Sequence, residues 1–261
     1  MSDDLSKLIQ SWPYDPDQTM RIIIADDGRA VLQVRLPLGI EQYEIDGRPD
    51  GKQPLGFTSY VDAIEDRLRK HIVETGSDLG FFIGADDGAQ LQAEGALYYY
   101  RYLILFQMQY YPKVVRDCDH NLHLCDLLER FCEDEETRNG VLQFRPYIIR
   151  MRAAAEALGI ESGESNGDFR KILEDAVEAI HNLEEIDTPA FQFERIRSIN
   201  YLKSMVKRMD VSESLPTTDL EIALQKAIED EDYETAALLR DRISGIDAGI
   251  DSAEKPVDKE Y

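Results

Sequence analysis

Residues 1–56 alternate between apolar and polar positions in short runs that end in turn residues. Residues 21–25 are rich in β-branched side chains, and an Asp-Asp-Gly turn signal follows them. Residues 30–36 alternate in part and residues 40–45 alternate cleanly, and the second of these runs enters the turn-rich cluster 46–51. Three such strands predict a small antiparallel sheet, which we expect to pack on the helix that follows it.

Beyond residue 56 the apolar residues recur at helical spacing. Val61, Ile64, Leu68 and Ile72 predict a helix over residues 58–74 with one buried face. The same spacing predicts further helices over about residues 90–106, 110–132, 141–158, 168–183 and 189–209, with a break at 84–88, a flexible loop at 159–167 and a candidate kink at Pro146. We expect Thr188 to cap the last of these helices and Pro189 to occupy its first turn.

The most apolar run of the chain lies at residues 97–108 and is interrupted by Arg101 and Gln107. A membrane-spanning helix needs roughly 18 apolar residues, so this run predicts a core helix instead. Its end, at residues 105–115, resembles a tetratricopeptide-repeat helix pair, although Met108 stands where that repeat prefers glycine. No second copy follows at the repeat's period, and the resemblance therefore implies a helical hairpin over about residues 97–132.

Two more amphipathic stripes lie near the C-terminus, on either side of the acidic stretch 229–232. Both fit helices whose apolar residues share one face. The first stripe consists of Leu220, Ala223, Leu224, Ala227 and Ile228, and the second of Tyr233, Ala236, Ala237, Arg240 and Ile243. A Thr-x-x-Glu capping box begins the first stripe at Thr218. The pattern predicts a helical hairpin over residues 217–246, followed by a disordered acidic tail over residues 247–261.

This hairpin resembles the UVR motif of bacterial proteins, named from the excision-repair proteins UvrB and UvrC. The pattern L-x-x-A-L-x-x-A-I followed by D-Y-x-x-A-A-x-L-R-D-x-I covers about residues 219–246. In that family the hairpin pairs with another hairpin or docks on a partner, in excision-repair complexes and in Clp-type unfoldases. The resemblance implies a packed seam of Leu224, Tyr233, Ala236, Ala237 and Leu239, with Arg240 and Asp241 on its rim.

Other UVR-containing proteins carry features that are missing from this sequence. The kinase-activator relatives have zinc-binding cysteine pairs ahead of the hairpin, and the repair enzymes have helicase or nuclease domains. This chain has neither those cysteine pairs nor a P-loop. The resemblance therefore implies an interaction protein and neither repair enzyme.

Charge narrows the range of partners. The chain carries 29 basic and 52 acidic residues, a formal net charge of −23, which repels polyphosphates and anionic membranes. One predicted helix, 189–209, is locally basic, and Arg195, Lys203 and Lys207 share one of its faces by spacing. This face fits either nucleic acid, as in a DNA-repair accessory protein, or the chain's own residues 211–261, which carry a net charge of −9. We favour the second interpretation.

The residues that could bind a metal or react chemically are scattered along the chain. Cys118, Cys125 and Cys132 recur every seven residues, which places them on one side of a helix. Two helical turns separate neighbouring thiols by about 10.5 Å, too far for a disulfide, and we expect buried thiols in a reducing compartment. The same helix carries His120 and His123, but without a Cys-x-x-Cys pair a metal site there is disfavoured.

A catalytic site finds little support in the sequence. An enzyme site between the sheet and the helices would involve Arg35, Tyr43 and Arg48, but turn formation accounts for the 46–51 cluster more simply. No Ser, His and acid arrangement stands out. The four histidines lie apart along predicted helices. We therefore expect no catalytic residue, no metal and no cofactor.

Together these patterns predict an α+β protein with a small N-terminal antiparallel sheet (1–56), a large helical body (57–210) and a C-terminal helical hairpin. The acidic start, without an apolar leader segment, predicts a cytoplasmic location. The expected function is non-enzymatic: docking of another protein, or of a second copy of the chain, through the hairpin. Nucleic acid and membrane are the disfavoured partners.

Overall fold

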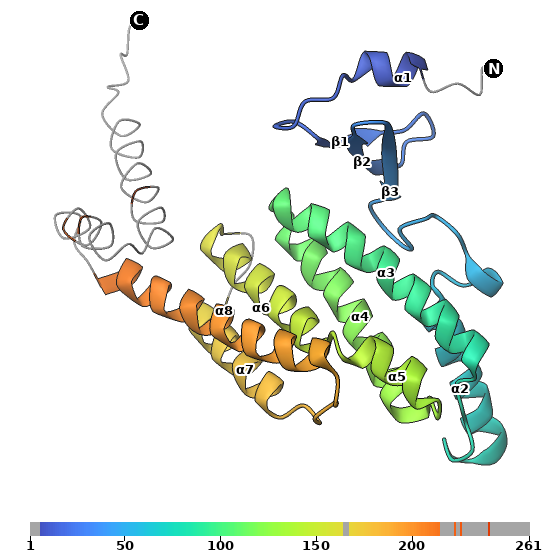
Figure 1. Cartoon of the computed structure of the whole chain (residues 1–261). Coiled ribbons are helices and arrows are strands. Elements are labelled where there is room, and N and C mark those ends of the chain that lie inside the picture. The colour runs from blue at the N-terminus through green and yellow to red at the C-terminus, as the bar shows by residue number, and fades with distance from the viewer. Residues whose placement is uncertain (1–5, 164–166, 215–221, 223–224, 226–239, 241–261) are drawn as a thin grey trace, which may run out of the picture. The chain divides into compact units, whose positions relative to one another are not determined.

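The computed structural model describes residues 6–163, 167–214, 222, 225 and 240 (Figure 1). It places the chain in two compact units, Met1–Leu202 and Lys203–Tyr261. The elements are α1 (Ser6–Ser11), β1 (Met20–Ile24), β2 (Ala30–Leu36), β3 (Gly39–Glu44), a 3-10 turn η1 (Pro54–Gly56), α2 (Tyr60–Thr75), α3 (Ala85–Gln107), α4 (Tyr111–Phe131), α5 (Glu135–Leu142), α6 (Arg145–Glu161), α7 (Phe169–His181) and α8 (Pro189–Ser214). The predicted α+β class is confirmed, while residues 217–246 of the expected hairpin lie almost entirely outside the described residues.

The three strands form one antiparallel sheet in the order β1-β2-β3. Leu32 on the central strand pairs with Ile22 on one side and Tyr43 on the other. The turn between β1 and β2 contains Gly28 at φ 85°, a left-handed conformation that favours glycine. The sheet was predicted nearly residue for residue because alternation and turn chemistry point to the same boundaries.

Helices α3 and α4 run side by side as a hairpin (Figure 1). The sheet packs on this hairpin. Leu32 and Ile45 from the sheet region join Tyr102 and Leu105 of α3 and Cys118 of α4 in one core cluster. A second cluster joins Val61 and Ile64 of α2 to the far end of the same helix pair. The apolar run 97–108 is therefore a core helix segment, as predicted.

The turn between α3 and α4 forms a hairpin without the glycine of the tetratricopeptide pattern. Met108 has φ −83°, and Gln109 takes the left-handed conformation at φ 63°. Gln109 is not a glycine, so this turn carries backbone strain that the packing of the two helices maintains.

Helix ends follow local sequence signals. Ser59, Asp134 and Asp168 accept hydrogen bonds from the backbone N–H three residues ahead, at the starts of α2, α5 and α7. Thr188 Oγ1 accepts from the N–H of Phe191 at 3.2 Å, which confirms the predicted cap of α8.

Several predicted boundaries are wrong. The expected helix over 141–158 is two helices, because α5 ends at Leu142 and Pro146 lies in the first turn of α6, where its missing N–H costs nothing. Gly88 lies inside α3 and not in a break, and Gly159 is buried within α6 and not in a loop. Ile72, expected on the buried face of α2, is 39% exposed.

In the described part of the chain, no helix combines the length and the apolar character needed to cross a bilayer.

Candidate functional site

The residues predicted to form the hairpin seam are Leu224, Tyr233, Ala236, Ala237 and Leu239, and they lie outside the described residues, as does Asp241. Arg240 is described and is helical and exposed. Ile222, which lies within the sequence of the first predicted stripe, is helical with 67% of its surface exposed. The contacts of the seam therefore remain a prediction.

The basic residues of α8 differ in their surroundings. The guanidinium of Arg195 donates through Nη2 to the carbonyl oxygen of His181 at 3.0 Å, a bond that ties α8 to the end of α7. Lys203 and Lys207 are exposed. Arg195 thus has a structural role, and the two lysines are the more accessible part of the predicted basic face.

The turn cluster 46–51 is fixed to the helical body. Arg101 donates to the carbonyl oxygens of Glu44 at 2.9 Å and Gly47 at 2.8 Å, and Arg116 donates to that of Ile45 at 2.8 Å. A hydrogen bond from Lys113 to Asp46, together with Arg116, lowers the pKa of the Asp46 carboxyl. These bonds hold the cluster as the joint between the sheet and α3–α4.

The other residues of the considered enzyme site also have structural partners. Arg35 is 3% exposed, and its guanidinium donates to the carbonyl oxygens of Trp12, Leu36 and Gly39. Tyr43 donates to Glu41 at 2.7 Å, and Arg48 forms ion pairs with Asp50 at 3.0 Å and Glu94 at 3.4 Å. Each of the three side chains is thus engaged by a partner within the described part of the chain.

Glu94 is the centre of a buried polar network. Its side chain is fully buried and accepts from the backbone N–H groups of Tyr60 at 2.7 Å and Val61 at 3.1 Å, so it caps α2 from within α3. His120 lies 3.2 Å from the same carboxylate and stacks on Tyr98 at 3.6 Å between ring centroids. Burial alone would raise the pKa of Glu94, but the bonds from His120 and the two N–H groups outweigh it, and the pKa is lowered.

The three thiols are buried and unpaired with one another, as predicted. Burial raises the pKa of the Cys125 thiol to about 12 and that of Cys118 well above its usual value. Cys132 also has a raised pKa from burial. A thiol becomes nucleophilic only as the thiolate, so this burial makes the three groups poor nucleophiles.

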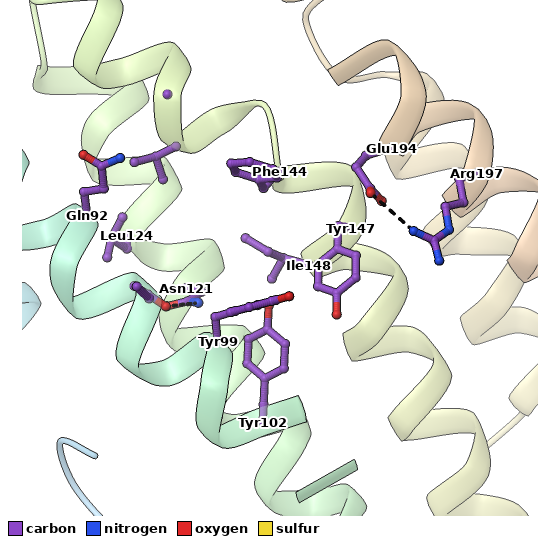
Figure 2. A pocket seen from close by; sticks show the side chains of 14 residues that line it. Gln92, Tyr99, Tyr102, Asn121, Leu124, Phe144, Tyr147, Ile148, Glu194 and Arg197 are labelled. Atoms are coloured by element: carbon purple, nitrogen blue, oxygen red, sulfur yellow. Dashed lines mark hydrogen bonds and ion pairs between the residues drawn. The ribbon is translucent and has the colours of Figure 1, made fainter. Parts of the chain in front are cut away.

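The described part of the chain contains a pocket of about 420 Å³ where α3, α4, α5, α6 and α8 meet. Figure 2 shows side chains from these helices around it. The residues that line it are Gln92, Gly95, Ala96, Tyr99, Tyr102, Asn121, Leu124, Gly140, Val141, Phe144, Tyr147, Ile148, Glu194 and Arg197. Small residues on α3 and α5 leave the space, and aromatic rings form much of the wall.

Two buried oxygen atoms of residues that line the pocket lack a hydrogen bond within the described structure: Asn121 Oδ1 and Glu194 Oε2. The amide nitrogen of Asn121 donates to the carbonyl of Gly95 at 3.0 Å, which fixes the orientation of the amide. Arg150 approaches Glu194 Oε2 only to 3.7 Å.

Sequence reasoning missed this pocket. Asn121 follows Cys118 by three residues on the buried face of α4, and a polar residue at such a position was the available signal. Glu194, by contrast, resembles any other acid in a chain with 52 of them.

Comparison with protein families gives a match near the C-terminus. The UVR family model, described as the UvrB/uvrC motif, matches residues 217–248. This match confirms the resemblance read from the sequence for that segment, and it covers no other part of the chain. No curated protein and no solved structure matches the chain significantly.

Proposed function

We propose that the protein is a non-enzymatic adaptor that docks another protein through its UVR segment. The single observation that carries this proposal is the family match over residues 217–248, since UVR motifs mediate protein interactions in excision-repair and Clp-type proteins. We accordingly propose a component of excision-repair or Clp-type machinery as the partner. A second copy of the chain is the alternative partner through the same segment.

The surroundings of the polar residues support a role without catalysis. Arg35, Arg48 and Arg101 have internal carbonyl or carboxylate partners, and the three cysteines are buried with raised pKa values. A catalytic acid, base or nucleophile has to reach a substrate. These groups instead hold the sheet, the loop 46–51 and the helices together.

The test measures binding of the full-length chain to purified excision-repair proteins and to a purified Clp-type unfoldase subunit. Ala236→Glu places a charge in the predicted close-packed seam, and we expect it to weaken binding at least about tenfold, because an unpaired charge is costly to desolvate. Gln225→Glu adds the same charge at an exposed position and should leave affinity unchanged. Equal affinity of the two variants for every partner would contradict the proposal.

The same preparation tests the DNA-binding alternative. Binding through phosphate contacts falls steeply between low and physiological salt, whereas apolar docking changes little. An electrophoretic shift that shows tight, salt-sensitive DNA binding, weakened by Lys203→Ala with Lys207→Ala, would favour the accessory-protein alternative. Sedimentation of the chain alone distinguishes self-pairing from capture of a different partner.

A further inference from the structure

The pocket among α3, α4, α5, α6 and α8 has the size of a small-molecule site. Its volume is about 420 Å³, and ligand pockets commonly span about 300–1,000 Å³. An apolar cavity of about 150 Å³ accommodates one benzene. The pocket therefore has room for two or three fused rings, or for one ring with substituents, and a partner's single aromatic side chain would leave much of it unfilled.

The α4 side of the pocket presents an unused acceptor. Asn121 is 5% exposed, and its amide orientation is fixed by the bond from its nitrogen to Gly95. The oxygen Oδ1 is buried and has no hydrogen-bond partner in the described structure. Leaving a buried acceptor unpaired is unfavourable, so a bound molecule that donates an N–H or O–H there gains affinity.

The α8 side presents a carboxylate. Among the described residues, none donates a hydrogen bond to Glu194 Oε2, and the neighbouring Arg150 and Arg197 reach its two oxygens only at 3.7 Å, beyond hydrogen-bond length. Figure 2 shows Glu194 on α8 beside Arg197. An ammonium or other strong donor on a ligand would complete the bonding of this group.

The walls between these two acceptors are aromatic. Tyr99 meets Tyr102 edge to face at 5.5 Å and lies 5.9 Å from Tyr147, and all three rings line the pocket (Figure 2). Burial raises the pKa of Tyr102 and Tyr147, so both phenols remain neutral. Neutral aromatic faces and edges favour a planar aromatic ligand.

We propose that this pocket binds a small planar aromatic molecule that donates a hydrogen bond to Asn121 Oδ1 and presents a cationic or strongly donating group to Glu194. The carboxamide selects for a ring N–H or O–H, and Glu194 Oε2 is the acceptor for the ligand's ammonium group, in competition with the guanidinium groups of Arg150 and Arg197. Tyr99, Tyr102 and Tyr147 supply the surface on which the ring packs.

The test titrates three probes into the full-length protein by calorimetry and ligand-observed NMR. Tryptamine carries a fused ring, a ring N–H and an ammonium group. N1-methyltryptamine lacks the ring N–H, and indole-3-acetate carries the opposite charge. We expect saturable 1:1 binding of tryptamine, and binding of N1-methyltryptamine weaker by about threefold to tenfold, the effect of one net hydrogen bond. Indole-3-acetate should bind more weakly than tryptamine.

Variants connect the binding to the pocket. Asn121→Leu should remove the difference between tryptamine and its N1-methyl derivative, and Glu194→Gln should narrow the gap between tryptamine and indole-3-acetate. Ala96→Leu fills the pocket from an exposed position with a good helix former, and it should lower the affinity for all three probes. Ala89→Leu is the matched control, since Ala89 is also exposed on α3 but lies about 10 Å away along the helix.

Three results would overturn the proposal. The first is the absence of saturable tryptamine binding, and the second is equal affinity of the Ala96→Leu and Ala89→Leu proteins for tryptamine. The third is tighter binding of N-acetyltryptophan amide, a mimic of a peptide side chain, than of tryptamine, which would identify a partner's aromatic residue as the occupant.

Discussion

Arg101 and Asp117 face each other across α3 and α4 with both side chains fully buried, joined by two hydrogen bonds of 2.7 Å. The remaining donors of Arg101 reach the carbonyls of Glu44 and Gly47. One guanidinium thus fastens the helix pair and also holds the end of the sheet against it.

Removing one member of this pair should be costly. Asp117→Leu leaves the Arg101 charge buried without its carboxylate, and we expect a loss of about 3–5 kcal/mol in the free energy of unfolding. Urea denaturation measures the loss. The double variant Arg101→Met with Asp117→Leu should be less destabilised than Asp117→Leu alone, because no unpaired charge remains.

An exposed pair provides the control for that prediction. Arg130 and Asp78 pair at 2.9 Å with side chains 61% and 41% exposed. Asp78→Asn should change the free energy of unfolding by less than about 1 kcal/mol. If Asp117→Leu also stayed below that change, the buried pair would not contribute as described.

The Glu94 network makes stability depend on pH. The folded-state pKa of Glu94 lies below the ordinary value of 4.5, so its ionised form is favoured by folding. The resulting stabilisation is fully present above pH 4.5 and is lost as the pH falls through the folded-state pKa. We expect wild type to be more stable than Glu94→Gln by about 1–3 kcal/mol at pH 7, and the difference to shrink in acid. Urea titrations of both proteins across pH 3–7 measure it (roughly the range over which carboxyl groups titrate).

The opposite trend would contradict the assigned role of Glu94. A gap between the two proteins that stays constant or widens toward acid would mean that the ionised carboxylate does not cap α2 or bind His120. Asp66→Asn, at a partly exposed carboxylate on α2, is the control and should show little pH-dependent difference.

Gly88 should be replaceable only at a cost. A Cβ at this position would lie 2.5 Å from the Cγ2 of Thr137, so either the Thr137 side chain or the backbones of α3 and α5 would have to shift. Gly88→Ala should destabilise the protein by about 1–3 kcal/mol, although alanine favours helix formation. Thermal unfolding measures the effect, and adding Thr137→Ser, which removes the clashing methyl group, should restore most of the stability.

Gly140 is the matched position for that test. It lies in α5, and a Cβ there would meet nothing within 4 Å. Gly140→Ala should be neutral or stabilising by up to about 1 kcal/mol. Equal destabilisation by the two alanine substitutions would contradict the close contact between α3 and α5.

The thiols should resist alkylation in the folded protein. Cys118 and Cys125 are fully buried, and burial raises their thiol pKa values, so little thiolate forms near pH 8. Iodoacetamide at that pH should modify neither residue in native protein and both in urea, as mass spectrometry would detect. Rapid native modification of Cys118 would show that the core around it opens readily.

Local patterns predicted the elements that local signals control. Residues 30–36 alternate in part and are bounded by turn residues, and β2 occupies the same range in the structure, where it pairs with a strand on each side. Thr188 and Pro189 begin α8 as their types require. The predicted kink at Pro146 is wrong because a proline can occupy the first turn of a helix as well as bend a helix. The end of α5 at Leu142 places Pro146 in the first turn of α6.

Contacts between residues far apart in the chain could not be predicted from the sequence. Glu94 caps a helix that begins 34 residues earlier, and no sequence pattern in either segment indicates that the two are in contact. In the sequence, Arg101 interrupts an apolar run. In the structure, it is one of the largest fully buried side chains. The pocket depends on Asn121 and Glu194, which are 73 positions apart and are brought together only by helix packing.

The donors that secure the loop 46–51 come from later in the chain, and this has a consequence for synthesis on the ribosome. Arg101 and Arg116 are translated more than fifty residues after the carbonyls of Glu44, Gly47 and Ile45 that they hold. The emerging sheet therefore has no permanent anchor until α4 has left the exit tunnel. Nascent chains that stop before Arg116 should expose the loop to proteases, and chains that include all of α4 should protect it.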